Sequence, residues 1–402
     1  TIRFLSETMN PLKAVFSEAG LFLLLCCIEI LLPIFAVESP LNSLVFWSLL
    51  GISLFYAIKL LYLVRYHSFI KWVYILLFMF VVYGILYYLY GPIYISPASG
   101  ERMHKLSYTT TILKSLSPLF PIYYYSKRGK ITSEFIQIWI IPLFVVAVIF
   151  YFDQMQAAML RHLMDDSVTN NGGYYIASLI PFAMFLSQKR LIQYVYLLTC
   201  LIFVIYSMKR GATVFAGLML LVYFNNSLLG ISIKKKLGFL VSFSVLLFGL
   251  YYFISEYMME NLYFLERIQD TLDGDTSGRD SLYDDFWEYF LYRATPLQQL
   301  LGGGANYTLT VSNNYAHNDW IEILVNQGIL GIFVFFMYWK SFFRTAFRTN
   351  LDKTCSIVIK MIFIGYFAKT MFSMSYTDYN IMVNLCLGYC ISRIDTTKSL
   401  TI

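Results

Sequence analysis

Hydrophobic segments long enough to cross a bilayer recur along almost the whole chain, and this feature most limits what the chain can fold into. A helix of about 20 apolar residues spans the roughly 30 Å of hydrocarbon in a bilayer. Twelve such segments lie between polar breaks, at about 14–37, 42–64, 70–90, 104–125, 132–152, 173–187, 191–208, 212–230, 237–258, 319–339, 354–374 and 379–393. No segment alternates polar and apolar residues as a membrane β-barrel requires. The sequence therefore predicts an all-α, polytopic integral membrane protein, with residues 1–402 forming one transmembrane helical domain.

Charge and cysteine usage exclude several other classes of protein. Only 13% of the residues are charged, about half the fraction in soluble proteins. Most Lys and Arg residues lie between hydrophobic segments on one side of the membrane, which predicts that both termini are cytoplasmic. This orientation explains the net positive charge, so we expect no nucleic-acid partner. All six cysteines lie in hydrophobic segments and none has the spacing of a zinc site, so we expect neither a metal nor a disulfide framework. The first hydrophobic segment is expected to be a retained membrane helix.

A few polar residues lie inside the predicted spans. The fourth segment contains Lys114, Ser115, Ser117 and two prolines, which indicates either a kinked helix that lines a cavity or a partly re-entrant segment. Charged side chains in hydrocarbon are costly and usually paired. Lys114, Lys360 and Lys369 therefore need partners, and Glu29 or Asp378 are the candidates between which the sequence does not choose.

One long polar passage, residues 273–331, interrupts this apolar pattern. We expect residues 259–318 to form an extracytoplasmic loop before the tenth span, and a loop of this length in a helical bundle is usually functional. Apolar positions from 282 to 291 repeat at helical spacing and predict a helix that lies on the membrane or covers a cavity. The acidic residues from Asp273 to Asp285 lack the closing carboxylate of a calcium-binding EF-hand, so we interpret them as solvated.

Three polar residues on the outer side are candidates for chemistry. Arg210 lies between two hydrophobic segments on the side that the charge bias disfavours, which indicates an anion site or an interfacial residue. Arg279 begins the loop helix. His317 lies at the outer mouth of the tenth span, with Glu322 about one turn further in, and a neutral imidazole there can act as a general base. Gly302, Gly303 and Gly304 let the backbone approach a ligand, but they are not followed by the residues of a phosphate-binding P-loop.

In this order, Arg210, GRDSLYDDFW, PLQQLLGGGANY and HNDWIEILVNQGILG resemble the C-terminal module shared by O-antigen polymerases (Wzy) and O-antigen ligases (WaaL), over roughly residues 200–340. The resemblance maps the two functional arginines of that family to Arg210 and Arg279, and its catalytic histidine to His317. Around these we expect substrate-binding residues, namely Lys209, Gly303, Gly304, Asn318 and Glu322. One departure is that Met208 and Lys209 precede Arg210 where serine and glycine are more usual.

The resemblance implies a glycosyltransferase in the bacterial cytoplasmic (inner) membrane, with its active site facing the periplasm or the outside. Its substrates are expected to be undecaprenyl-diphosphate-linked glycans, and it is expected to work without a cofactor or metal. Polymerisation of repeat units is our first interpretation, transfer of polymer to lipid A core is the second, and a polysaccharide flippase or transporter is the third. Membrane lipid and a polysaccharide copolymerase, the regulator of chain length, are the implied partners.

Overall fold

The computed structural model describes residues 10–36, 39–63, 67–95, 102, 104–162, 170–186, 190–228, 252, 269, 278–348, 352–377 and 379–396. Its elements are α1 (Pro11–Val15), α2 (Glu18–Phe35), α3 (Pro40–Leu63), α4 (Ser68–Tyr90), α5 (Ser107–Leu116), α6 (Leu119–Lys127), α7 (Ser133–His162), α8 (Gly172–Ala177), the 3₁₀ helix η1 (Ile180–Leu186), α9 (Arg190–Tyr206), α10 (Arg210–Leu228), α13 (Arg279–Glu288), the π-helix η3 (Tyr289–Arg293), α14 (Pro296–Leu301), α15 (Tyr307–Ser312), α16 (Asp319–Ala346), α17 (Lys353–Lys369) and α18 (Ile381–Thr396). No strand occurs in this part of the chain, which confirms the all-α prediction.

Five of the described helices, α2, α3, α4, α7 and α16, are long and apolar enough to cross a membrane. Shorter apolar helices occupy residues 172–186, 190–206 and 381–394, where the sequence predicts further spans. The predicted ninth span, 237–258, and the loop residues Asp273 and Asp275 lie outside the described residues. The protein is thus a multi-pass membrane protein, while the count of twelve spans stays a prediction.

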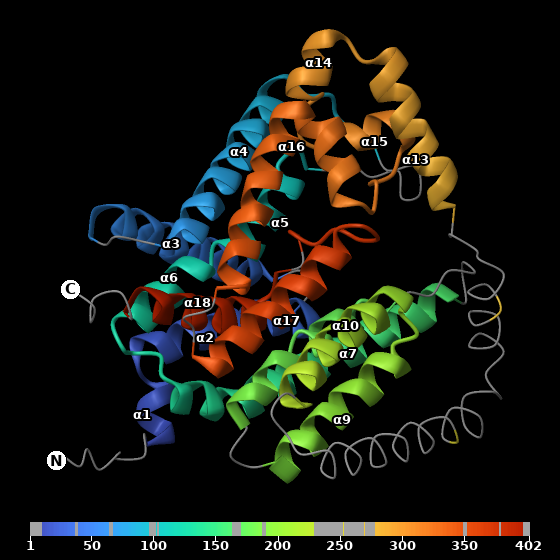
Figure 1. Cartoon of the computed structure of the whole chain (residues 1–402). Coiled ribbons are helices and arrows are strands. Elements are labelled where there is room, and N and C mark those ends of the chain that lie inside the picture. The colour runs from blue at the N-terminus through green and yellow to red at the C-terminus, as the bar shows by residue number, and fades with distance from the viewer. Residues whose placement is uncertain are drawn as a thin grey trace.

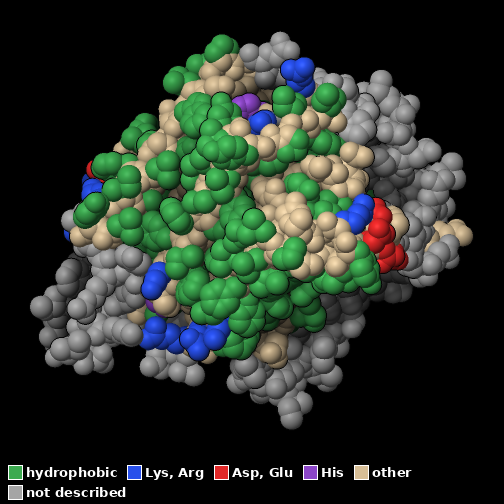
Figure 2. Space-filling model, turned by 90° about the horizontal axis from the view of Figure 1, so that it is seen from above, with side chains coloured by type: hydrophobic (Ala, Val, Ile, Leu, Met, Phe, Trp, Pro, Cys, Tyr) green, Lys and Arg blue, Asp and Glu red, His purple; other side chains and the backbone are tan. Residues whose placement is uncertain are grey.

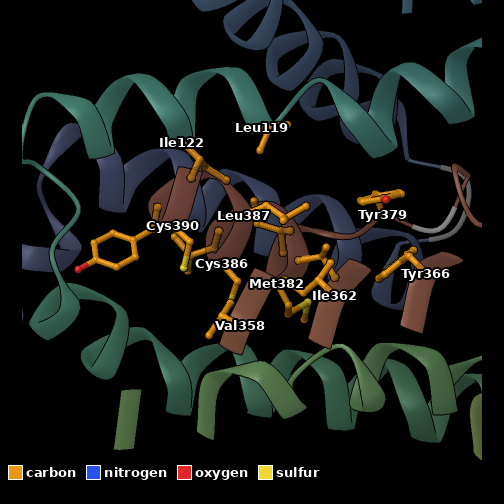
Figure 3. Close-up of a cluster of buried hydrophobic side chains, with 14 of the residues drawn as sticks. Leu119, Ile122, Val358, Ile362, Tyr366, Tyr379, Met382, Cys386, Leu387 and Cys390 are labelled. Atoms are coloured by element: carbon orange, nitrogen blue, oxygen red, sulfur yellow. The ribbon is translucent and has the colours of Figure 1, made fainter. Parts of the chain in front are cut away.

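The helices are arranged around two central packing interfaces (Figure 1). In the upper part of the view α16 runs beside α4, and α14 packs against it, with α13 and α15 nearby. In the middle, α18 packs against α6 and α17, and α17 in turn packs against α10. Figure 3 shows how Ile122 of α6, Val358 and Ile362 of α17, and Leu387 of α18 converge in this interface. The result is a continuous apolar core that holds the polar segments at its edge.

The surface has the character of a membrane protein. Hydrophobic side chains dominate the face seen in Figure 2, and Lys and Arg side chains form small separate groups on it. Large apolar side chains such as Phe78, Ile141 and Leu191 are strongly exposed on the long helices. An apolar surface of this extent fits contact with lipid rather than with water.

The fourth predicted segment forms two short helices, α5 and α6, which are separated at Ser117 and Pro118. Proline lacks the backbone N–H that would continue the hydrogen bonding of a helix. Lys114 in α5 forms an ion pair with Glu29 in α2, which confirms one of the two predicted pairings. Both residues line a cavity of about 210 Å³ together with Ser115 and Pro118. The segment therefore lines a cavity, and its path through the membrane stays a prediction.

The other two lysines within predicted spans contact aromatic rings. Lys369 is buried, and its Nζ lies 3.9 Å from the ring centroid of Tyr174. The Nζ of Lys360 lies 5.8 Å from the ring centroid of Phe347. The faces of aromatic rings attract cations, and this attraction strengthens when water is excluded. Asp378, the second partner considered for these lysines, lies outside the described residues. All six cysteines are free and buried.

Candidate functional site

A short turn that follows α17, residues 370–375, is the meeting point of the candidate residues. We refer to it as the 370–375 turn. Its first three carbonyl oxygens accept hydrogen bonds from Asp319 N at 2.9 Å, Asn318 Nδ2 at 3.1 Å and Arg279 Nη1 at 2.9 Å. The starts of α13 and α16, which are separated by 40 residues of sequence, are thereby attached to successive residues of one turn. Arg279 and Asn318, the residue next to His317, therefore bind neighbouring carbonyls of this turn.

The start of α10 also lies against the 370–375 turn. A side-chain carbon added to Gly211 would lie 3.1 Å from the ring of Phe372 and 2.0 Å from the hydroxyl of Tyr174. A side chain at this position would have to displace Tyr174, so Gly211 lets the start of α10 lie close to Tyr174 and to the ring of Phe372. Phe372 is the residue whose carbonyl accepts from Arg279. Met208 takes a left-handed conformation with φ 53° between α9 and α10. The tight break predicted before Arg210 is present, and both Lys209 and Arg210 are half-buried.

His317 is held in an unusual backbone conformation just before α16. Its φ of 51° is in the left-handed region, which few residues other than glycine adopt. The residue as a whole is exposed, although surrounding protein atoms exclude part of the water from its ring. Desolvation lowers the pKa of His317, and the positive charges of Arg279 and Lys209 lower it further. The imidazole is therefore neutral near neutral pH and able to accept a proton.

Tyr283 provides a second link between α13 and the start of α16. Burial raises the pKa of Tyr283, and the neighbouring charge of Arg279 and a hydrogen bond with the Asn318 side chain partly offset this rise. Tyr283 also packs on the small apolar cluster beneath α13. One face of α13 thus packs against the segment just before His317. Trp287 and Leu291, two of the predicted apolar positions, are exposed.

The predicted substrate-binding residues of the α16 first turn are already engaged within the protein. Asn318 caps α16, because its side-chain oxygen accepts from Trp320 N and Ile321 N. Glu322 is fully buried, and its carboxylate accepts hydrogen bonds from Thr308, Asn326 and Ala316. These contacts make both residues part of the support for His317, and their contact with substrate stays a prediction.

The glycine run packs against a kink in α16. Gly328 has φ 67° and ψ −164°, which interrupts the helix. The amides of Gly303 and Gly304 donate to the carbonyls of Val325 and Asn326 at 3.0 Å and 2.9 Å. A side chain on Gly302 would clash with the α16 backbone at 2.3 Å. The glycines therefore allow two backbones to touch, and the predicted binding of a ligand by Gly303 and Gly304 stays a prediction.

Sequence reasoning missed the 370–375 turn, because it acts mainly through backbone carbonyls that every residue carries. The predicted eleventh span extended to residue 374, whereas α17 ends at Lys369. Asp319 was missed as well, although a carboxylate in the first turn of a membrane helix is a signal that calls for a partner. Within the described residues, no three His, Cys, Asp or Glu side chains are grouped so that they could hold a metal ion.

Comparison with known proteins supports the resemblance seen in the sequence. Residues 175–336 match the family model described as O-antigen ligase. The matched region begins in α8 and ends within α16, and it contains Arg210, Arg279 and His317. No curated protein matches the chain significantly.

Proposed function

Because residues 175–336 carry a domain of the O-antigen ligase and polymerase superfamily, we propose that this protein is an O-antigen-type polymerase. It joins undecaprenyl-diphosphate-linked oligosaccharide repeat units on the outer side of the bacterial cytoplasmic membrane. The observation that carries the proposal is that Arg279 and Asn318, the residue next to His317, donate to the neighbouring carbonyls of Phe372 and Met371. The positive charges of Arg279 and Lys209 also lower the pKa of His317. A neutral imidazole beside cations is the combination that a transfer from a diphosphate donor requires.

In the proposed reaction a hydroxyl of the acceptor glycan attacks the anomeric carbon of the donor glycan. The new carbon–oxygen bond forms as the bond to the lipid diphosphate breaks, and the anomeric centre is inverted. His317 takes the hydroxyl proton as the attack proceeds. The electron pair of the broken bond stays on the diphosphate, which leaves with an additional negative charge.

Arg279 and Arg210 stabilise the charge of the leaving diphosphate. Guanidinium groups suit this role because they stay charged and can form two parallel hydrogen bonds to a phosphate. Arg279 carries five N–H donors, and its Nη1 donates to Phe372 O at 2.9 Å. This bond fixes the direction of the guanidinium and leaves other donors for the ligand. Lys209 adds positive charge next to the base.

The remaining partners follow from the same chemistry. The polyprenyl tail is apolar and binds between helices whose outer surfaces are apolar, such as α3 and α7. A polysaccharide copolymerase is the proposed partner for control of chain length. No metal is needed, because the arginines supply the positive charge that a magnesium ion supplies in many sugar-nucleotide enzymes.

A ligase that transfers the finished polymer to lipid A core is the second candidate, and the description of the matching family favours it. One experiment separates the two functions. Purified full-length protein in lipid nanodiscs is given a single lipid-linked repeat unit, with and without lipid A core. Ladders of products from the repeat unit alone support the polymerase, and product that requires lipid A core supports the ligase. The absence of product in both conditions contradicts both.

A further inference from the structure

Two carboxylates in the first turn of α16, Asp319 and Glu322, are both 0% exposed. A buried carboxylate is costly unless several hydrogen bonds compensate for the lost water. The two side chains are three residues apart on one helix, yet their partners lie in different segments. Asp319 binds the 370–375 turn, whereas Glu322 binds the segment that leads to His317.

Glu322 holds the backbone immediately before His317. Its Oε2 accepts from Ala316 N at 2.7 Å. Its Oε1 accepts from Thr308 Oγ1 at 2.7 Å and from Asn326 Nδ2 at 2.6 Å. Asn326 closes the network, because its Oδ1 accepts from Thr308 N at 3.0 Å. The start of α15 and the turn with the left-handed His317 are thus attached to one rigid helix.

This network requires a group that only accepts hydrogen bonds. Three donors point at Glu322, and a carboxylate can accept all of them with its two oxygens. A glutamine of the same shape has one acceptor oxygen and one donor nitrogen. Its nitrogen would face either the Ala316 N–H or the donors from Thr308 and Asn326, so at least one buried donor would lose its partner.

Asp319 holds the other half of the candidate site. Both of its carboxylate oxygens accept from Ser375 N at 3.0 Å, and Oδ2 also accepts from Ser375 Oγ. Its own N–H donates to Thr370 O at 2.9 Å. Asp319 therefore holds both ends of the 370–375 turn, and the middle of that turn carries the Phe372 carbonyl that fixes Arg279.

We propose that Glu322 and Asp319 are positioning residues with separate tasks: Glu322 sets the position of the His317 base, and Asp319 sets the position of Arg279 toward the diphosphate. The inference rests on the proposed glycan transfer. It goes beyond that proposal because it assigns both carboxylates to the support of the site and not to the chemistry. A misplacement of about 1 Å in a catalytic group can reduce a rate by roughly 100-fold, so positioning by hydrogen bonds is measurable in the kinetics.

The two tasks predict different kinetic changes in the full-length protein in nanodiscs supplied with a lipid-linked repeat unit. Glu322→Gln should lower kcat by about 10- to 100-fold with KM for the donor nearly unchanged, because the base acts only in the transition state. Asp319→Ala should lower kcat, as loss of Arg279 does, and should in addition raise KM for the donor by about 10-fold or more, because Arg279 also binds the donor in the ground state. Asp319→Asn keeps one acceptor for Ser375 N–H and should recover most of that loss.

Gln327 offers a matched control on the same helix. It is fully buried, and among the described residues its side-chain nitrogen and oxygen have no hydrogen-bond partner. Gln327→Leu should therefore leave kcat, KM and the amount of folded protein unchanged. If Glu322→Gln does not accumulate as folded protein, Thr308→Val removes one donor while the Ala316 bond remains. That variant should lower kcat several-fold at constant KM, as expected from a loosened support.

A KM for the donor that rises as much in Glu322→Gln as in Asp319→Ala would overturn the inference. An effect of Gln327→Leu on kcat as large as that of Glu322→Gln would overturn it as well. Parallel measurement of His317→Ala separates this inference from the proposed function. If His317→Ala abolishes transfer while Glu322→Gln turns over normally, the positioning role is wrong and the glycosyltransferase proposal survives. If His317→Ala transfers normally, the proposed function itself is wrong.

Discussion

Two regions of the molecule use different means to fix their side chains. In the helical core, formed by α6, α17 and α18, apolar residues such as Ile122, Ile362 and Leu387 interdigitate at full burial (Figure 3). In the region that we call the cap, residues 279–325 with α13, η3, α14, α15 and the start of α16, the apolar cluster has five buried members among the described residues. The cap is instead organised by hydrogen bonds that link buried carboxylates to backbone N–H groups.

This difference has a physical consequence for function. Apolar packing is non-directional and tolerates exchanges of similar volume. Hydrogen bonds to a buried carboxylate specify position and direction, and they fail when one partner is changed. A region that must hold a base and an anion-binding guanidinium in fixed relative positions therefore benefits from the second mode. Variants in the cap are expected to change the rate of glycan transfer, whereas variants in the core are expected to change the free energy of unfolding.

The largest expected effect comes from His317→Ala. Loss of the general base should reduce glycan transfer by about 100- to 10,000-fold, while the protein still inserts and unfolds at the same temperature. The matched control is His104→Ala, which removes an exposed histidine outside the cap. Polymer ladders that persist in membranes containing the His317 variant would contradict the assignment of the base.

Arg279→Ala should reduce kcat by about 100- to 1,000-fold, as expected when a donor to a developing negative charge is lost. Release of lipid diphosphate from the donor is the direct measurement. Arg293→Ala is the control, because that guanidinium lies on the same loop and is exposed beside Glu288. Equal rates of release in the Arg279 variant and the wild type would remove Arg279 from the site.

The core variant Ile362→Ala should lower the stability of the protein and leave its activity unchanged. Ile362 is fully buried, and loss of such a side chain lowers the free energy of unfolding by about 2–5 kcal/mol. Transfer activity per folded molecule should stay unchanged, because the candidate residues are held by hydrogen bonds to the cap and the 370–375 turn, none of which involves Ile362. Denaturation in detergent and activity normalised to folded protein test this contrast. A large loss of specific activity without loss of stability would show that the two regions are not separable.

Lys209→Met should give a smaller change, in the pH dependence. The charge of Lys209 lowers the pKa of His317, so its removal should raise that pKa toward the ordinary value. Since the neutral imidazole is the active form, the rate falls as pH drops through the pKa, and the acid limb of kcat/KM should move to higher pH. Arg293→Met serves as the control. An unchanged acid limb in the Lys209 variant would show that Lys209 does not act on the base.

The smallest expected effect is that of a chelator. Transfer by the wild-type protein should continue at the same rate in EDTA, because the proposed chemistry uses arginines in place of a metal ion. A loss of activity that magnesium restores would contradict this part of the proposal.

Hydropathy was sufficient to predict the helices of the core, because burial in lipid or in a bundle requires the same apolar composition that the sequence displays. The polar residues of the fourth segment indicated an irregular helix there, and Glu29 was one of the two partners considered for Lys114. The structure breaks the segment at Ser117 and Pro118 and pairs Lys114 with Glu29. In the cap, the candidate residues Arg279 and His317 were identified by their position and by the resemblance. The structure adds the contacts between their segments.

The remaining features of the cap have no sequence signature. The 370–375 turn receives three hydrogen bonds through main-chain carbonyls, and any sequence offers those groups. The pattern of charges places Glu322 near the outer surface, but burial and three hydrogen bonds depend on how α15 folds back on α16. The glycine run is likewise explained only by the kink at Gly328, against which its backbone packs and which lies 24 residues after Gly304.

A double-mutant cycle on transfer from a lipid-linked repeat unit tests the central claim most directly. The claim is that His317 and Arg279 act on the same reacting donor. Groups that act as one unit show strongly non-additive effects, so the variant with both alanines should be scarcely slower than the slower single variant. If the two losses multiply as independent factors, or if either single variant keeps the wild-type rate, the two residues do not form one catalytic site.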